Sequence, residues 1–480
     1  MSCGFIGVSG FRRAGRIMVD HRRINESDRM YLSPVFLRPG EATSLARWEI
    51  ADDMLAPETA YQIVHDEAML DGNARLNLAT FVSTFMDKHA RDLYAETVDK
   101  NIIDKDEYPA TAAIEERCWR IIGNLWNNPD IDNAIGTSTI GSSEACMLGG
   151  LALKRRWRER RVADGKPVDS PNVVLSTAVQ VCWEKFCNYF EVEPRWVPVD
   201  ADHLVMDGHD LENYVDENTI GVVAIMGQTF TGLFEPVKAI AEKLDEIHAS
   251  TGLDLKIHVD AASGGMVAPF CHPDIEWDFR VDRVASINTS GHKYGLVYPG
   301  VGWIVWRSVA DLPESMVFHC AYLGGNMPTL ALNFSRPGAQ VLLQYYQLLR
   351  LGRAGYTAVQ QGALDVAQFL SSQIAALGPF DLVSKGDTIP AFAWKLKDGY
   401  TENWTLYDLE ERLRLKGWQV PAYPMADNLA DMTLQRIVVR FGLSHDLAES
   451  LLADIKTEVA FLDSLNSPMR REATGTHFHH

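Results

Sequence analysis

Short apolar runs that alternate with helix-patterned or polar segments occupy the middle of the chain and constrain its fold most strongly. Runs typical of strands cover 172–176, 219–226, 255–260, 284–289 and 302–307. Between two of these runs, apolar side chains recur at helical spacing over 237–250 and predict an amphipathic crossover helix. Apolar strands separated by helices favour a mostly parallel central sheet flanked by helices on both faces. The sequence therefore predicts an α/β fold.

The regions on either side of this core differ from it in pattern. Residues 1–57 are Arg-rich and poorly periodic, and they are predicted to form an N-terminal arm. A large domain is expected over 58–375. A smaller C-terminal α/β domain is expected over 376–465, where strand-like and helical patterns alternate again, and a tail covers 466–480.

Composition limits the partners and the compartment. The 480 residues include 45 Lys and Arg against 64 Asp and Glu, a formal net charge of −19, which disfavours nucleic acid and anionic membranes as partners of the surface. The seven Cys are scattered without C-x-x-C spacing, so Cys182 and Cys187 are expected as buried free thiols of a reducing compartment. With no membrane-length apolar run and no pattern of a secretory signal, a cytoplasmic protein is expected.

Polar residues stand where several predicted strands end. Asp260 closes one strand in "IHVDAASGG", and His292 and Lys293 follow the next in "SINTSGHKYG". Ser142 and Ser143 open a long helical pattern whose N-terminus offers unpaired N–H groups to an anion. Each feature also has an ordinary explanation, as a turn residue, surface polarity or a helix N-cap. Because ligands of open α/β sheets bind beyond the carboxyl ends of the strands, all of them are expected in one site.

An anion cradle, a lysine and a carboxylate together match the needs of pyridoxal phosphate. The amine of Lys293 would form a Schiff base with the cofactor's aldehyde, which requires a lowered lysine pKa. The carboxylate of Asp260 would keep the pyridine nitrogen protonated, so that the ring accepts electrons from a bond broken at Cα. The small side chain of Ala262 would let the ring lie flat. The sequence therefore predicts a pyridoxal 5'-phosphate site and no metal site.

Several sequence blocks resemble one family. They are "LDGNARLNLATF", "IDKDEYP", "IGTSTIGSSEACMLGGLALK", "QVCWEKFCNYFEVE", "HVDAASGG" and "SINTSGHKYGLVYPGVGWIVWR". In this order they are similar to blocks of the group II pyridoxal-phosphate decarboxylases, and within them of the bacterial glutamate decarboxylases, over about residues 55–465. The resemblance implies the fold type I of pyridoxal-phosphate-dependent transferases.

The resemblance also implies roles for individual residues. Lys293 resembles the Schiff-base lysine, Asp260 the partner of the pyridine nitrogen, and His292 a catalytic neighbour of the lysine. The remaining cofactor contacts implied are phosphate ligands Ser142, Ser143, Ser290 and His292, Thr229 near the ring oxygen, Gln180 stacked on the ring, and Ser335 reaching the phosphate from a neighbouring subunit. A site of this kind makes a dimer the smallest competent unit, so a homo-oligomer is implied, either a dimer or a hexamer of stacked dimers.

The implied reaction converts L-glutamate to 4-aminobutyrate and CO₂ and consumes one proton, which suits a role in acid resistance. For the distal carboxylate of the substrate, the matching positions are Thr80, Phe81, Asn101 and Asp104. Arg436 is similar to the arginine that grips the α-carboxylate, since a guanidinium fork fits a carboxylate in two-point contact. Arg440 is expected as a solvated charge at the end of a strand.

Both ends of the chain have open interpretations. The tail "GTHFHH" resembles the short tail that plugs the active site of enteric enzymes at neutral pH, with His479 or His480 as the titrating group, or it is a frayed terminus. The Arg-rich arm departs from the acidic arm of enteric relatives, which counts against membrane association at low pH. No calmodulin-binding site is expected, since the tail lacks the basic, Trp-bearing pattern of the extension in plant enzymes.

Two alternative functions fit part of the pattern. One is a decarboxylase of another acidic amino acid, aspartate or cysteine sulfinate. Gln180 together with Thr80 and Asn101 favours an acidic substrate in general, and the match of the surrounding blocks favours glutamate. The other is a non-catalytic pyridoxal-phosphate-binding scaffold, which the presence of Lys293, Asp260 and Arg436 together disfavours.

Overall fold

The central sheet occupies the larger of two compact units, residues 73–480; the other unit spans residues 1–72. The structure is a computed structural model and describes residues 48–468 except 51, 53 and 321–326. Most of the predicted arm and the tail residues His479 and His480 lie outside the described residues. Within the smaller unit the structure describes helix α2 (Pro57–Ala68), which begins at a proline. The domain bounds expected from the sequence stay predictions.

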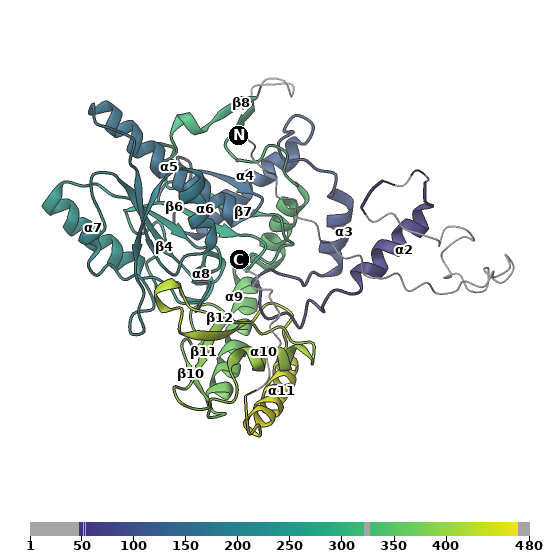
Figure 1. Cartoon of the computed structure of the whole chain (residues 1–480). Coiled ribbons are helices and arrows are strands. Elements are labelled where there is room, and N and C mark those ends of the chain that lie inside the picture. The colour runs from purple at the N-terminus through teal and green to yellow at the C-terminus, as the bar shows by residue number, and fades with distance from the viewer. Residues whose placement is uncertain (1–47, 51, 53, 321–326, 469–480) are drawn as a thin grey trace, which may run out of the picture. The chain divides into compact units, whose positions relative to one another are not determined.

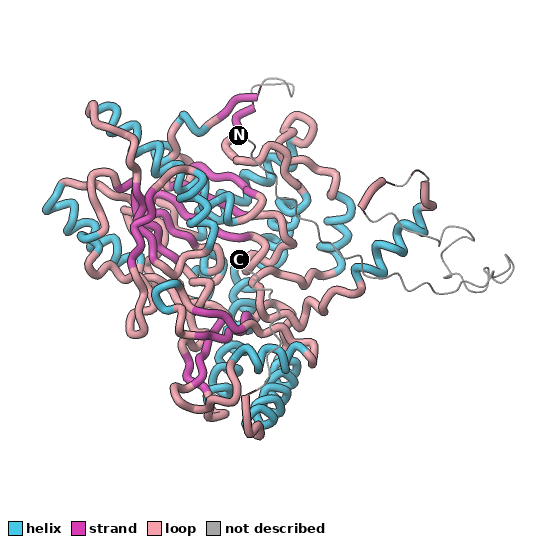
Figure 2. The backbone as a smooth tube through the Cα atoms, viewed as in Figure 1, coloured by secondary structure: helices cyan, strands magenta, loops and turns pink. Residues whose placement is uncertain are grey.

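Seven strands within the described residues form the central sheet, in the order β1-β7-β6-β5-β4-β2-β3. Figures 1 and 2 show the sheet together with the helices that flank it. They are β1 (Ile135–Thr139), β2 (Asn172–Ser176), β3 (Glu193–Val197), β4 (Thr219–Ile225), β5 (Ile257–Asp260), β6 (Val284–Ser290) and β7 (Gly302–Trp306). β7 runs antiparallel to both neighbours and the others are parallel, which confirms the mostly parallel sheet. β1 and β3 were not predicted, because as edge strands they are polar and only partly buried.

Helices cover both faces of this sheet, as predicted. On one face, α5 (Ser142–Ala163) and α6 (Val181–Tyr189) pack against apolar side chains of β2 and β4. On the other, a second cluster joins α4 (Pro109–Leu125), α7 (Val237–Thr251) and the start of α9 (Ala339–Ala375) to the sheet. The shorter helices are α3 (Lys88–Thr97), α8 (Ala268–Cys271), η1 (Leu211–Asn213), η2 (Gly264–Met266), η3 (Val309–Asp311), η4 (Glu314–Met316) and η5 (Asp427–Leu429).

A second sheet follows α9 in the chain. In the described part of the chain it is antiparallel, with the order β10-β11-β13-β12. Its strands are β10 (Phe380–Leu382), β11 (Ala391–Leu396), β12 (Ala422–Pro424) and β13 (Thr433–Val438), and α10 (Leu406–Arg414) and α11 (His445–Asp463) pack with it. The C-terminal part of α9, from Ala363 to Ile374, contributes to the same core. A separate hairpin pairs β8 (Phe318–Cys320) with β9 (Met327–Thr329).

An extended segment at 74–82 is held against this second sheet. Leu78 exchanges backbone hydrogen bonds with it, donating to Gln419 at 2.9 Å and accepting from Val438 at 3.0 Å. The guanidinium of Arg440 donates to the carbonyl oxygens of Val82, Asn77 and Ala74. The expectation that Arg440 is a solvated charge is therefore wrong: its side chain is 6% exposed and clamps the segment. A one-dimensional pattern does not reveal that a segment more than 350 residues away supplies its acceptors.

Replacement of Arg440 by methionine is expected to destabilise the protein. The methionine keeps an apolar stem but leaves the carbonyl oxygens of the segment without their donor, at a cost of about 2–4 kcal/mol of unfolding free energy. Urea unfolding followed by circular dichroism measures the loss. The matched control is Arg414→Met, which removes an exposed arginine paired with Glu410 and is expected to change stability by less than about 1 kcal/mol. Equal effects of the two substitutions would contradict the clamp.

Candidate active site

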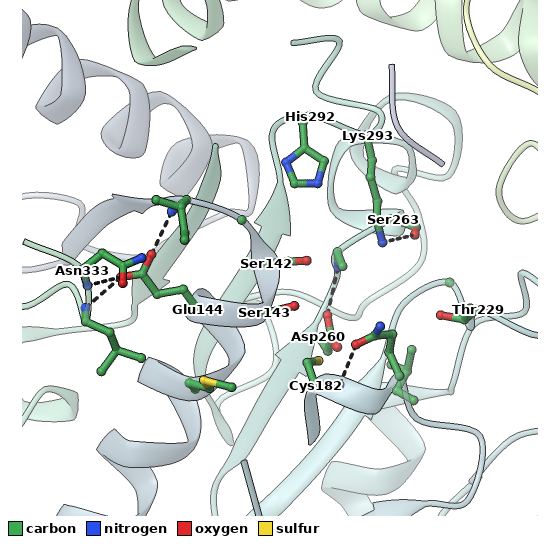
Figure 3. Close-up of a pocket in the computed structure, with 18 of the residues that line it drawn as sticks. Ser142, Ser143, Glu144, Cys182, Thr229, Asp260, Ser263, His292, Lys293 and Asn333 are labelled. Atoms are coloured by element: carbon green, nitrogen blue, oxygen red, sulfur yellow. Dashed lines mark hydrogen bonds between the residues drawn. The ribbon is translucent and has the colours of Figure 1, made fainter. Parts of the chain in front are cut away.

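A cavity of about 550 Å³ opens where β4, β5 and β6 end. It gathers residues that lie far apart in the sequence, and Figure 3 shows their side chains directed into one space. The predicted cofactor residues that line it are Ser142, Ser143, Gln180, Thr229, Asp260, Ala262, His292 and Lys293. The residues placed at strand and helix ends in the sequence, Asp260, His292, Lys293, Ser142 and Ser143, therefore line one cavity.

One end of the cavity is suited to an anion. Ser142 and Ser143 form the first turn of α5, where backbone N–H groups are unpaired by the helix and the helix dipole is positive. The Oγ of Ser290, from β6, donates to the Oγ of Ser142 at 2.7 Å. His292 Nδ1 is buried and has no hydrogen-bond partner among the described residues. A buried, orphaned ring nitrogen beside a helix N-terminus fits a phosphate that would share a proton with it.

Glu144 lies in the same helical turn, yet its carboxylate is occupied elsewhere. It accepts hydrogen bonds from the backbone N–H groups of Ile140, Leu332 and Asn333 at 2.8, 2.7 and 3.1 Å. These contacts fix the loop around residue 332 at the mouth of the cavity. Glu144 was not singled out from the sequence, where an acid in the first turn of a helix is ordinary.

Lys293 presents an amine to the middle of the cavity. Its Nζ lies 3.4 Å from Ser263 Oγ and 5.2 Å from the centre of the Phe81 ring. Burial lowers the pKa of Lys293 below its ordinary value; the charge of Asp260 opposes this shift, and that of Arg436 adds to it. The lowered pKa increases the fraction of free amine, which is the form that attacks a carbonyl.

Asp260 is held by several N–H donors at the end of β5. The indole of Trp183 donates to Oδ2 at 2.9 Å, while the Asn288 amide and the backbone N–H of Ala262 donate to Oδ1 at 3.1 Å. The thiols of Cys146 and Cys182 lie within 4.8 Å of the carboxylate and of one another. Burial raises the pKa of Cys146, so this thiol stays neutral. Asp260 therefore supplies a buried, oriented negative charge.

Arg436, on β13 of the second sheet, lies next to the cavity and contacts Thr229 of its lining. It is 7% exposed and donates to the carbonyl oxygens of Thr229 and Ala79, the latter at 2.7 Å. Its guanidinium carbon lies 4.8 Å from the centre of the Phe81 ring and 5.4 Å from that of Tyr423. Its Nε has no partner among the described residues, which leaves part of the fork available to a carboxylate.

Some predicted site residues lie apart from the cavity. In the described part of the chain, its lining does not include Thr80, Phe81, Asn101, Asp104, Ser290, Ser335 or Arg436. Three of these residues contact residues of the lining: Phe81 faces Lys293, Ser290 is hydrogen-bonded to Ser142, and Arg436 donates to Thr229. Asn101 Nδ2 instead donates to the Oγ of exposed Ser335 at 3.2 Å. Gln180 lines the cavity and also caps α6, since its Oε1 accepts from the backbone N–H of Cys182 at 2.7 Å.

Sequence reasoning missed Ser263, Trp183 and Asn288. Ser263 lies in the small-residue run after Asp260, directly before η2, and its hydroxyl meets Lys293, which comes from the loop after β6. In the sequence, Trp183 is typical of the buried side of a helix and Asn288 lies inside an apolar strand-like run. The one signal available was a polar residue, Asn288, inside a fully buried strand, since buried polar groups need partners.

Comparison with known proteins agrees with this geometry. Residues 51–397 match the conserved domain of pyridoxal-dependent decarboxylases. The chain belongs to this family. As a pyridoxal-dependent decarboxylase it takes pyridoxal phosphate as its cofactor, and the residues of the cavity fit that group: a helix N-terminus and an orphaned histidine nitrogen for the phosphate, a lysine amine, and a buried carboxylate.

The decarboxylase has close relatives in bacteria. A glutamate decarboxylase of Aliivibrio fischeri is 49% identical over 431 residues, which cover 90% of this chain and 93% of that protein. Glutamate decarboxylase beta of Listeria innocua is 47% identical over 441 residues, covering 92% and 95%. The solved glutamate decarboxylase of Lactobacillus brevis superposes with a TM-score of 0.87 at 45% identity, covering 91% of this chain and 99% of that chain. The predicted fold type is confirmed.

The buried histidines of the decarboxylase make its stability depend on pH. Burial lowers the pKa of His258, a residue of β5, to about 4, whereas an unfolded histidine titrates near 6.5. Between these values the unfolded state binds more protons, so stability falls as pH falls from about 6.5 towards 4, by up to about 3 kcal/mol from this group. Urea unfolding at pH 7 and pH 5 is expected to show a smaller loss in His258→Phe than in the parent.

The control for this experiment is His248→Phe, on the exposed face of α7. Its loss of stability between the two pH values is expected to equal that of the parent. A His258→Phe variant that loses as much stability as the parent would contradict the assignment of the pH dependence to the buried ring.

Proposed function

We propose that this decarboxylase converts L-glutamate to 4-aminobutyrate and CO₂. The observation that carries the proposal is the meeting of Lys293, Asp260 and the N-terminus of α5 in one cavity, with Arg436 beside the lysine. The bacterial relatives that share 46–49% of its residues are named glutamate decarboxylases, which supports glutamate over aspartate or cysteine sulfinate. A non-catalytic scaffold would have no need of a buried lysine with a lowered pKa.

Bound pyridoxal phosphate supplies an aldehyde for the amines of Lys293 and the substrate, and a ring that takes up the electrons of the broken Cα–carboxylate bond. The first turn of α5 and His292 would hold its phosphate, and Asp260 would keep a proton on its ring nitrogen. The small side chain of Ala262 would leave room for the ring, and Gln180 lies at the start of α6 on the same cavity.

Arg436 and Lys293 would handle the substrate. The guanidinium of Arg436 is held in place by the carbonyls of Thr229 and Ala79, so its remaining N–H groups are already directed when the α-carboxylate arrives. A substrate α-carboxylate bound there would be the group lost as CO₂, and the fixed guanidinium of Arg436 would set its orientation. After CO₂ leaves, the amine of Lys293 is placed to return a proton to Cα. This proton is consumed from the surroundings.

The net uptake of a proton supports a role in acid resistance, and the free thiols support a reducing compartment such as the cytoplasm. The described cysteines Cys118, Cys146, Cys182, Cys187 and Cys271 are free. Among the described helices, none has the length and apolar character needed to cross a membrane.

Part of the substrate site is proposed to come from a neighbouring subunit. Asn101 and Ser335 are hydrogen-bonded to each other, and the backbone N–H of Arg336 donates to Asn101 Oδ1 at 3.1 Å, so the loop at 335–336 and the segment at 101–104 form one surface. Ser335 is exposed and lies outside the cavity lining of its own chain in the described structure. A homodimer in which this surface closes the partner's cavity would bring Asn101, Asp104 and Ser335 to a shared site.

Lys293→Ala is expected to abolish turnover and the visible absorbance of the bound cofactor, because among the described residues that line the cavity no other side chain offers an amine to the aldehyde. Formation of 4-aminobutyrate from L-glutamate, followed with the absorbance spectrum at pH 4.5 to 7, measures both. The exposed lysine Lys185→Ala serves as the control and is expected to behave as the parent. Normal turnover by Lys293→Ala would overturn the proposed function.

Shared sites can be tested by complementation. Lys293→Ala lacks the amine, and Ser335→Glu would place a negative charge against the phosphate of the partner's site; each is expected to be inactive alone. Co-expression of the two variants with different tags allows mixed dimers to be purified. One of the two sites in such a dimer combines the intact Lys293 of one subunit with the intact Ser335 of the other. Such dimers are expected to recover about half of the parent activity. Inactive mixed dimers would show that Ser335 does not act on the partner's site.

A further inference from the structure

A row of polar side chains runs along one face of the two central strands β5 and β6. Their parallel register sets His258 opposite Ser286 and Asp260 opposite Asn288. Side chains two residues apart in a strand point to the same face, so all of them share the face covered by α5 and α6. His258 and Asn288 are 0% exposed and Ser286 1%. Polar side chains buried on this face are unusual, because apolar residues would pack there without the desolvation penalty.

The hydrogen bonds of the row have one direction. Ionised Asp260 can only accept, so the Asn288 amide presents its NH₂ group to Asp260 Oδ1, at 3.1 Å. Asn288 Oδ1 then faces His258 Nε2 at 2.8 Å, which must carry the proton. His258 Nδ1 is left as an acceptor for the Ser286 hydroxyl, also at 2.8 Å. Each donor in the chain therefore points towards Asp260, and bonds aligned in this way polarise one another.

The surroundings hold this chain in place and keep it neutral. The His258 ring packs against the indole of Trp183, with ring centres 5.3 Å apart, and Trp183 itself donates to Asp260. Gly149 of α5 gives the ring its space, because a Cβ there would lie 2.3 Å from His258 Cε1. Burial lowers the pKa of His258 to about 4, so the ring carries no charge at neutral or mildly acidic pH. The row thus adds oriented dipoles beside Asp260 and no competing ion.

We propose that Asn288 and His258, backed by Ser286, are positioning residues that keep Asp260 ionised and turned towards the ring nitrogen of the cofactor. The inference rests on the proposed cofactor site and deepens it. Without Asn288, Asp260 would lose one of its donors and hold a proton more readily. The proton shared with the ring nitrogen would then move towards Asp260, and the ring would accept electrons less well.

The test uses holoenzymes reconstituted with pyridoxal phosphate labelled with ¹⁵N in the ring. The variants are Asn288→Leu, which removes the donor, and His258→Phe, which keeps a ring but frees the Asn288 amide. In both, the ¹⁵N resonance is expected to shift towards that of an unprotonated ring. Asn288→Leu is expected to weaken cofactor binding and lower kcat for L-glutamate by about tenfold or more, since a hydrogen bond to a charged group is lost, with little change in KM. His258→Phe is expected to show the same changes in smaller measure.

Thr289→Val is the matched control. Thr289 is the neighbour of Asn288 in β6, is 0% exposed, and its Oγ1 has no partner among the described residues, yet its side chain points to the opposite face. This variant is expected to keep the parent's resonance, cofactor affinity and kcat. If the ¹⁵N resonance in Asn288→Leu and His258→Phe has the same position as in Thr289→Val, the proposal is overturned, whatever the activity of the variants.

If Asn288→Leu does not fold, His258→Phe and Ser286→Ala give the same reading, because both break the chain of donors without removing the contact to Asp260. Unshifted resonances in both would then overturn the proposal. The resonance is recorded without substrate. A parent enzyme that binds the cofactor but leaves L-glutamate unchanged would therefore overturn the proposed function and not this inference.

Discussion

The parallel pairing of β5 with β6 is the constraint on which the site depends. Its register places Asp260 and Asn288 side by side, and the loop after β6 then carries Lys293 over the same edge of the sheet. Both strands are fully buried. A carboxylate and an amine are thus held near one another in a region of low dielectric, where their interaction is stronger than at a surface. The cofactor chemistry of the family requires this juxtaposition.

Buried charge around the cavity is compensated unevenly. Asp260 takes N–H donors from Trp183, Asn288 and the backbone. Glu144 is satisfied by backbone N–H groups of a loop, and Arg436 by backbone carbonyls. The amine of Lys293 has one hydrogen bond among the described residues, a long one of 3.4 Å to Ser263, beside its contact with the Phe81 ring, and burial lowers its pKa. Asp260 and Glu144 are thus held by several donors, whereas the group that must react has the least stabilisation of its charged form.

The parts of the site that could be predicted from the sequence are those governed by local rules. Asp260, Lys293 and Ser142 stand at strand and helix ends, where pattern and topology together determine a position. Trp183 and Asn288 could not be predicted to meet Asp260, because their contacts depend on how α6 packs on the sheet and on the strand register. The failure at Arg440 has the same origin, since its acceptors lie at the other end of the chain. In the fold, the apolar central strands were found and the polar edge strands β1 and β3 were missed.

The arginine pair of β13 and the turn after it has a mechanical consequence. Arg436 and Arg440 both hold the segment at 74–82, and Arg436 also reaches Thr229 at the end of β4. The segment at 74–82 is therefore tied to the second sheet, and through Arg436 the second sheet is tied to the end of β4. Separation of the second sheet from the central sheet at this point would have to break the hydrogen bond of Arg436 to Thr229. The guanidinium and the Phe81 ring, 4.8 Å apart, are thus fixed by contacts from both sheets.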